Sequence, residues 1–154
     1  MISVVSSGQE TSMNSENKLL ISSGGERVAL VRECSSFLDI GKGLLGSAEP
    51  EDTQGLFGGV LLRIPGYRQR FSGLINSIHM IGMKYPLSVF WISEGRVTEK
   101  VLAEPGFHIY SPSFPSTAVI ELPGRAISAF SVGDKLTFEK VRVSGDVLSG
   151  GEMQ

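Results

Sequence analysis

A chain of 154 residues is long enough to bury a hydrophobic core within one domain. Its formal net charge of −2 gives no general attraction to phosphate backbones or anionic lipids, which argues against nucleic-acid and membrane partners. The single cysteine excludes an internal disulfide, and the lack of a secretory signal or of a run of roughly 18 apolar residues predicts a cytoplasmic protein.

The two ends of the chain are polar and poor in residues that could be buried. Residues 1–17 are rich in serine and predict a flexible lead-in, within which either Met1 or Met13 could be the true start. Residues 144–154 contain three glycines and little to bury, which predicts a flexible tail. The folded part is therefore predicted to be a single β domain over residues 18–143.

Apolar runs separated by turn residues predict strands in the first half of the folded part. Lys18–Ser22 and Arg27–Glu33 flank a Ser-Gly-Gly turn and predict a hairpin. Phe37–Leu45 is interrupted by glycines and predicts an irregular segment rather than a helix. Phe57–Ile64 is nearly continuous in apolar residues and ends at Pro65-Gly66, which indicates a strand buried on both faces.

The middle of the chain contains two more predicted strands, Ile78–Met83 and Leu87–Ile92. In the second, odd-numbered and even-numbered side chains should face opposite sides of a sheet. The two-residue connection Glu94-Gly95 joins it to Arg96–Leu102, so these strands should form a hairpin.

The last part of the folded region begins with a predicted strand at Thr117–Leu122. Pro123 suits the first turn of a short helix, predicted over residues 123–130. In the final strand, Leu136–Val143, the apolar positions switch from even to odd numbers, which predicts a β-bulge. We therefore expect a mostly β, single-domain protein: a small β-barrel or sandwich of roughly seven to nine strands with one short helix near 123–130.

A longer pattern links several of these segments. The sequence IHMIGMKYPLSVFWI at Ile78–Ile92 resembles the central signature of the domain-of-unknown-function 192 family. Three other stretches are similar to further elements of that family and follow in its order: Lys42–Leu45, Gly55–Phe57 with Ile64-Pro65, and Val119–Pro123 with Gly133–Leu136. The resemblance spans about residues 37–138 and implies a compact all-β domain with no assigned activity. The chain departs from the family pattern at Ser88, Ser93 and Pro123-Gly124-Arg125, which puts in doubt any function that uses carboxylates of that pattern.

A metal site is the first chemical hypothesis, because His79, Met80 and Met83 are suitable donors for copper. On a regular strand His79 and Met83 would lie about 13 Å apart, and Met80 would point to the opposite face. We therefore expect core packing for the methionines, a hydrogen-bonded and partly buried His79, and no metal. No sequence motif indicates a cofactor, since the glycine-rich stretches match neither nucleotide-binding pattern.

Catalysis by a nucleophile or an acid–base pair has little support. No serine lies in a nucleophile-elbow pattern, and Cys34 is expected to be buried and inert. Glu121 should be solvated or paired, because its strand neighbours are expected to point inward, and Asp134 should stabilise a turn. A small hydrolase or transferase with His79 or His108 as general base is the alternative function.

Two loop stretches are the stronger candidates for binding. Arg63–Phe71 combines Arg63, Tyr67 and Arg68, and is either a phosphate or single-strand contact or a solvated loop. Phe107–Ser116 presents Phe107, Tyr110 and Phe114, which either contact a ligand or plug the end of a barrel. The favoured function is a non-catalytic binding or interaction module that uses these residues with His79 to contact a small ligand or a protein. A third hypothesis is a structural accessory subunit, recognisable by an exposed apolar patch.

Overall fold

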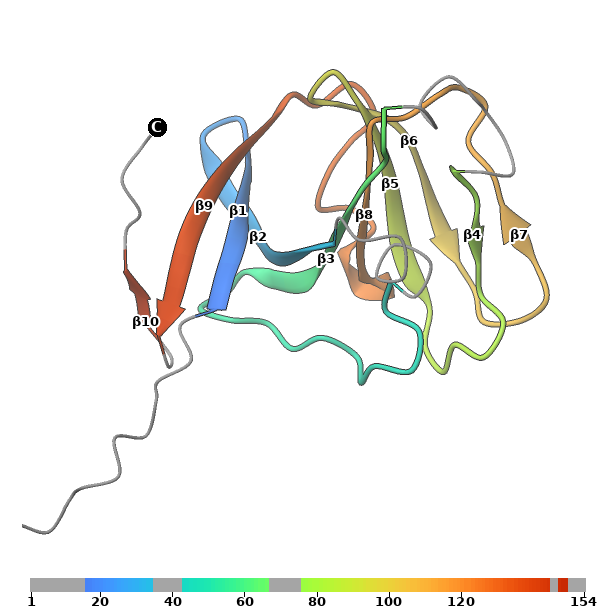
Figure 1. Ribbon diagram of the computed structural model, residues 1–154, viewed down its shortest axis with the longest axis horizontal. Helices are drawn as coiled ribbons and strands as arrows, with labels where there is room; N and C mark the ends of the chain where they lie inside the picture. Colours follow the sequence, from blue (N-terminus) through green and yellow to red (C-terminus); the bar gives the residue numbers. More distant parts are fainter. Residues whose placement is uncertain (1–15, 35–42, 67–75, 145–146, 150–154) are drawn as a thin grey trace, which may run out of the picture.

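The computed structural model describes residues 16–34, 43–66, 76–144 and 147–149, and these residues form a mostly β protein (Figure 1). The strands are β1 (Glu16–Ser23), β2 (Glu26–Cys34), β3 (Phe57–Arg63), β4 (Ile78–His79), β5 (Leu87–Ser93), β6 (Arg96–Ala103), β7 (Ile109–Tyr110), β8 (Ala118–Pro123), β9 (Leu136–Ser144) and β10 (Val147–Ser149). A short 3-10 turn, η2 (Gly124–Ala126), follows β8. Within the described ranges, no helix has the length and apolar character to span a membrane.

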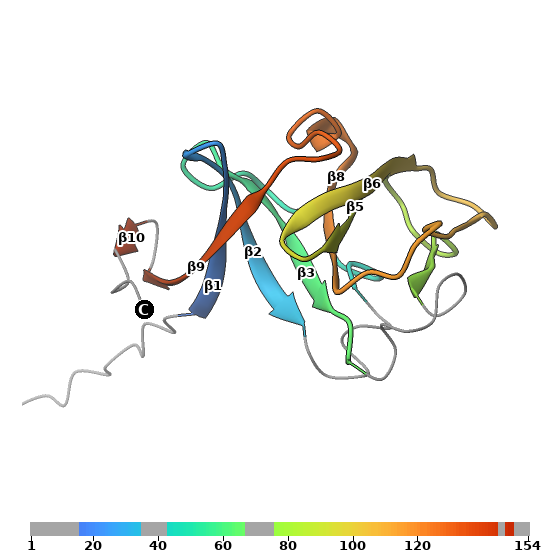
Figure 2. The same cartoon turned by 90° about the horizontal axis from the view of Figure 1, so that it is seen from above.

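Eight strands form one sheet in the order β10-β9-β1-β2-β3-β8-β5-β6, and β4 pairs with β7 in a separate two-stranded sheet. The large sheet curls, so that Arg96 at the start of β6 makes an isolated bridge with Lys135 just before β9 (Figure 2). Beyond that bridge the strands diverge, because β9 pairs with β1 and β6 with β5. The expected barrel is therefore not closed in the part of the chain described here.

Both predicted hairpins are confirmed. β1 and β2 are antiparallel around Gly24 and Gly25, and β5 and β6 are antiparallel around Glu94 and Gly95. All four turn residues have positive φ, from 50° at Glu94 to 83° at Gly25. Positive φ at both central residues is the requirement of a type I′ turn, whose twist matches that of the strands it joins.

Two large apolar cores occupy the opposite faces of the central strands. The first core includes Phe90 and Phe130, whose rings meet edge to face with 5.1 Å between centroids. The second core includes Trp91 and Met80, and it lies between the large sheet and the β4–β7 pair. Consecutive residues of β5 therefore enter different cores, which confirms the predicted alternation.

β3 confirms the prediction of a strand covered on both faces. It pairs in parallel with β2 and antiparallel with β8, which places it inside the sheet. Val60 and Leu62 enter the second core, whereas Leu61 enters the first.

Three local predictions need correction. The predicted strand Ile78–Met83 ends at His79, because the Met83 N–H donates to the Met80 carbonyl across a turn. The short helix predicted near 123–130 is present, but it is the 3-10 helix η2 and shorter than expected, since Ile127 and Ala129 bond three residues back rather than four.

The predicted bulge in the last strand is the third error. β9 pairs with β1 in unbroken register from Leu136 to Val143. The irregularity lies in the β1–β2 pairing, where Ile21 pairs with Ala29 and Ser22 with Arg27, so that β2 carries the extra residue. The apolar positions change parity because Leu136 packs in the first core, whereas Val141 packs on a smaller apolar cluster.

The close approach of β3 and β8 provides a test of this architecture. A Cβ on Gly59 would lie 2.1 Å from the backbone carbonyl oxygen of Glu121, an atom that cannot move aside without shifting β8. We expect Gly59→Ala to lower the free energy of unfolding by at least roughly 2 kcal/mol in urea denaturation.

Gly66→Ala is the matched control, because a Cβ there would meet nothing within 4 Å. It should change the free energy of unfolding by no more than roughly 0.5 kcal/mol. Equal effects of the two substitutions would contradict the packing of β3 against β8.

Candidate functional site

The β4–β7 pair divides its side chains between a buried and an exposed face. His79 lies opposite Ile109, and Ile78 lies opposite Tyr110. Ile78 and Tyr110 are partly buried against the second core. His79 and Ile109 point the other way and are exposed, so the expected partial burial of His79 is wrong. Directly opposite residues of an antiparallel pair share a face, which explains this division.

Exposed apolar side chains lie on this pair and directly beside it in the chain. Phe107 is 89% exposed, Ile109 58% and Ile81 48%, although each side chain is large and hydrophobic. We call His79, Ile81, Phe107 and Ile109 the β4–β7 surface; Phe107 precedes β7 and Ile81 follows β4. Single exposed apolar residues are common, but several of them around one strand pair are typical of an interaction site.

Tyr110, a predicted contact residue, has a supporting position instead. It packs against the second core, and the Glu104 N–H donates to its hydroxyl oxygen at 3.0 Å. The Gly106 N–H donates to the Met80 carbonyl at 3.3 Å, which ties the loop before β7 to the chain after β4. Removing the Tyr110 ring would therefore disturb the surface rather than only a contact made by it.

The remaining predicted contact residues are not all brought together. Phe114 is 65% exposed and follows Ser113, whose N–H donates to the Glu99 carboxylate on β6. Arg63 ends β3 and forms an ion pair with Glu33 at 2.8 Å. Tyr67 and Arg68 lie outside the described residues. Of the three candidates in Arg63–Phe71, Arg63 alone therefore has a described position.

The geometry offers no support for a histidine base. His108 is exposed with its ring 6.4 Å from that of Tyr110, and among the described residues neither histidine side chain bonds to an acid or a hydroxyl. The described ranges also bring together no group of three or more potential metal ligands of the His, Cys, Asp and Glu types. Cys34 is buried, as expected.

A second feature, which the sequence did not indicate, is the buried carboxyl group of Glu121. The residue is only 4% exposed and lies on β8 opposite Val60 of β3 and Val89 of β5. Both valines belong to the second core, so the carboxyl group enters that core rather than solvent. The prediction that Glu121 is solvated or paired fails in its first alternative, because both faces of β8 are covered and the side chain is buried.

The Glu121 carboxyl group is covered by the chain before β3. The Leu44 N–H donates to Oε2 at 3.3 Å, and a Cβ on Gly43 would lie 2.7 Å from the same oxygen. Burial raises the pKa of Glu121 from 4.5 to about 7, and the bond from Leu44 opposes this rise only in part.

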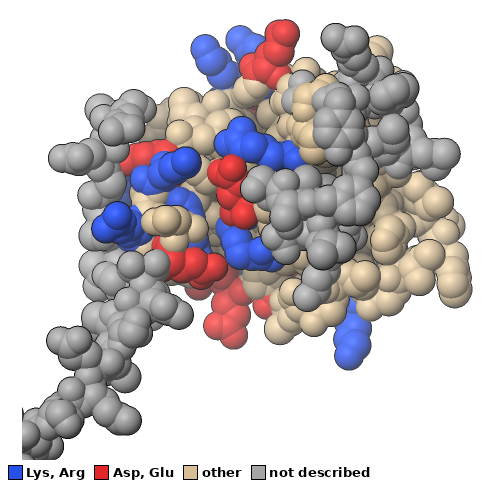
Figure 3. Space-filling view, viewed as in Figure 1, with Lys and Arg blue, Asp and Glu red and all other residues tan. Residues whose placement is uncertain are grey.

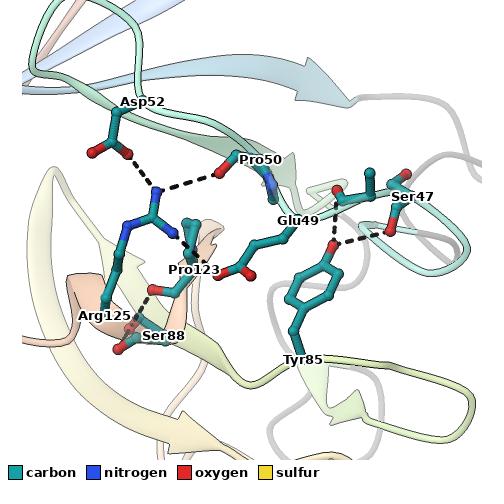
Figure 4. Close-up of polar contacts among 10 residues, drawn as sticks. Ser47, Glu49, Pro50, Asp52, Tyr85, Ser88, Pro123 and Arg125 are labelled. Carbon is teal, nitrogen blue, oxygen red and sulfur yellow. Dashed lines mark hydrogen bonds and ion pairs between the residues drawn. The ribbon is translucent and has the colours of Figure 1, made fainter.

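The covering segment, residues 43–52, is fastened by two further side chains (Figure 4). The Tyr85 hydroxyl lies 3.3 Å from the Ser47 carbonyl oxygen and 3.2 Å from that of Ala48, and donates toward both. Arg125 forms ion pairs with Glu49 at 3.1 Å and Asp52 at 2.5 Å. Burial and the nearby charges of Glu49 and Glu121 raise the pKa of Tyr85, which keeps its hydroxyl a donor.

The arrangement around Glu121 brings together segments that are far apart in the sequence. Gly43 and Leu44 cover the carboxyl group, and Met83 packs in the same core as Leu44. The Gly124 N–H donates to the Pro86 carbonyl, which joins the end of β8 to the start of β5. The Ser88 hydroxyl lies 3.0 Å from the carbonyl oxygens of both Pro123 and Gly124. Ser88 thus links β5 to the end of β8.

Comparisons with known proteins give a fold but no family. No family model matches the sequence, and no curated protein matches it. A crystal structure of a protein of unknown function from Novosphingobium aromaticivorans is similar, with a TM-score of 0.61, 17% identity, and coverage of 78% of this chain and 83% of that one. A protein from Sinorhizobium meliloti, described as a "putative transcription regulator", is similar with the same TM-score and identity, over 80% of this chain and 95% of that one. At this identity the likeness shows a shared fold alone.

The raised pKa of Glu121 makes stability depend on pH. The folded protein holds this proton up to about pH 7, whereas the unfolded chain releases it near pH 4.5. The contribution of Glu121 to the free energy of unfolding should therefore fall as pH rises between these values and then level off. The total loss should be about 3 kcal/mol. Glu121→Gln should remove this pH dependence. The free energy of unfolding of the variant minus that of the unmodified protein should therefore increase from pH 4.5 to pH 8.5.

Urea denaturation at a series of pH values measures this difference. Glu104→Gln is the control, because Glu104 is exposed, and its pH profile should parallel that of the unmodified protein. Parallel profiles for Glu121→Gln as well would show that the Glu121 carboxyl group is ionised in the folded state.

Proposed function

We propose that the protein is a non-catalytic interaction module that binds an apolar patch of a partner protein through the β4–β7 surface. The observation that carries this proposal is the exposure of three large apolar side chains on and beside the β4–β7 pair: Ile109 on β7, Phe107 just before β7 and Ile81 just after β4. Burying large apolar side chains against a partner releases roughly 25 cal/mol per Å² of apolar surface removed from water. Aromatic anchors of this kind dominate the binding energy of many protein interfaces.

The charge distribution favours a protein partner over a phosphate-bearing one. The four residues of the β4–β7 surface include no lysine, arginine, aspartate or glutamate. In Figure 3, blue and red side chains gather mainly over the centre and left of the molecule, whereas tan surface prevails on the right, where Figure 1 places β4 and β7. A site without fixed cations would gain little from nucleic acid or anionic lipid.

The structure of this element suits a docking surface. Tyr110 and Ile78 anchor the pair to the second core, so the outer side chains are held by a rigid base. Such preorganisation reduces the entropy lost on binding. The hydrolase or transferase alternative lacks a comparable observation, because neither histidine has an acid or hydroxyl partner in the part of the chain described.

We also propose that the chain belongs to the domain-of-unknown-function 192 family and acts in a reducing compartment such as the cytoplasm. The meeting of the family-like stretches around Glu121 supports the first proposal, since a shared fold needs such contacts between distant segments. The second proposal is supported by the presence of a single cysteine, Cys34, which cannot form an internal disulfide.

The interaction proposal predicts that a double substitution, Phe107→Ser with Ile109→Ser, abolishes partner binding without unfolding the domain. Both side chains are exposed, so the midpoint of thermal unfolding should change little. The measurement is quantitative mass spectrometry of proteins captured from the native source by the tagged full chain. Candidates recovered there are then titrated as purified proteins, and the Kd should rise at least tenfold in the double variant.

Val132→Ser is the matched control, because Val132 is also 58% exposed but lies in the turn before β9. It should retain every partner that the double variant loses. Sedimentation analysis tests whether the surface binds a second copy of the chain instead of another protein. In that case the unmodified chain would form a dimer and the double variant would not. A captured set unchanged in the double variant would refute the proposal.

A further inference from the structure

The first core ends in an open hollow of about 300 Å³ at the mouth of the curled sheet. Most of its described lining is apolar and comes from β3, β5, β8 and β9 and the residues next to them. The lining residues on which the inference rests are Leu61, Arg63, Ile92, Thr117, Ala118 and Phe138. A volume of this size lies at the lower end of the range for ligand pockets, roughly 300–1,000 Å³.

The hollow exists because the sheet does not close between β6 and β9. Phe138 lies two residues after Leu136 and so faces the same side of β9, yet it is 37% exposed, whereas Leu136 is 4% exposed. Leu136, next to the Arg96–Lys135 bridge, is buried, whereas Phe138, two residues farther along β9, is partly open to solvent at the hollow. The apolar interior of the domain is thus accessible from one end.

Arg63 gives this apolar hollow a single charge. It lies two residues after Leu61 on β3, so its side chain leaves the strand on the side of the first core. It is the only ionisable residue in the described lining. Its Nε donates to Glu33 Oε1 at 2.8 Å, and within the described ranges its terminal nitrogens make no other bond. A guanidinium group carries five donors in a fork that matches a carboxylate, so Arg63 can bind an anion while it keeps Glu33.

We infer that the hollow binds a small monocarboxylate with a short aliphatic or aromatic body. The body would contact Leu61, Ile92 and Phe138, and the carboxylate would accept hydrogen bonds from the terminal nitrogens of Arg63 at the mouth. This site is separate from the β4–β7 surface and does not depend on the interaction proposed there. Glu33 has a defined role: it competes with the ligand for Arg63 and limits the affinity.

The test is a titration of the full chain with octanoate, followed through the amide signals of Thr117 and Ala118 in two-dimensional NMR spectra. Octanol and octylamine are the neutral and cationic probes of the same length. Octanoate should bind at least tenfold more tightly than either, because charge-assisted hydrogen bonds to a guanidinium group need an anion. Arg63→Gln should weaken octanoate binding about tenfold or more and leave octanol binding unchanged.

Glu33→Gln tests whether Arg63 binds the carboxylate directly or only maintains the shape of the hollow. It removes the competing carboxylate, so octanoate should bind more tightly than to the unmodified protein. Arg27→Gln is the control, because Arg27 is exposed on β2 and does not line the hollow, and its octanoate affinity should not change. Ala118→Phe should fill the hollow and abolish binding of all three probes.

Three outcomes would overturn the inference. They are equal affinity for octanoate and octylamine, an octanoate affinity that falls or stays unchanged in Glu33→Gln, and an absence of shifts at Thr117 and Ala118. Because Arg63 and Glu33 are partly exposed, their variants should fold even if Ala118→Phe does not.

Discussion

Burial of the Glu121 carboxyl group in an apolar core decides how the chain before β3 is arranged. A carboxyl group in such a place must lose its charge or gain donors, and here one backbone N–H, from Leu44, supplies the only donor among the described residues. That bond requires residues 43–52 to lie over the second core, where Gly43 leaves room for the carboxyl oxygens. Tyr85 and Arg125 then hold the segment in place from two sides.

This arrangement explains why distant stretches of the chain depend on one another. The carboxyl group enters from β8, its cover comes from the chain before β3, and the tie at Ser88 comes from β5. Arg125 is exposed and its individual ion pairs contribute little, but two acids and a carbonyl oxygen on one guanidinium group define the position of the segment. Geometry rather than net electrostatic energy is what these exposed contacts supply.

Local sequence signals predicted the parts of the fold that local forces decide. The two-residue turn at Glu94-Gly95 and the apolar run of β3 needed no knowledge of the tertiary structure. The errors arose where distant segments decide the outcome. The alternation of side chains along β8 predicts that Glu121 faces solvent only if one face of β8 is exposed. Nothing in the sequence shows that residues 43–52 cover that face. His79 was expected to be partly buried because its strand was predicted to continue to Met83, whereas the chain turns after Met80.

The parts of the molecule that maintain the fold are different from those that are free to bind. The stretches with the most distinctive sequence meet around Glu121 and contact each other. Packing between them therefore explains their residue types. The exposed face of β4 and β7 and the open end of the first core lie outside these contacts. Apolar side chains at both places remain exposed to solvent. Exposed apolar surface has a cost in solubility, and binding a partner or a ligand would remove that cost.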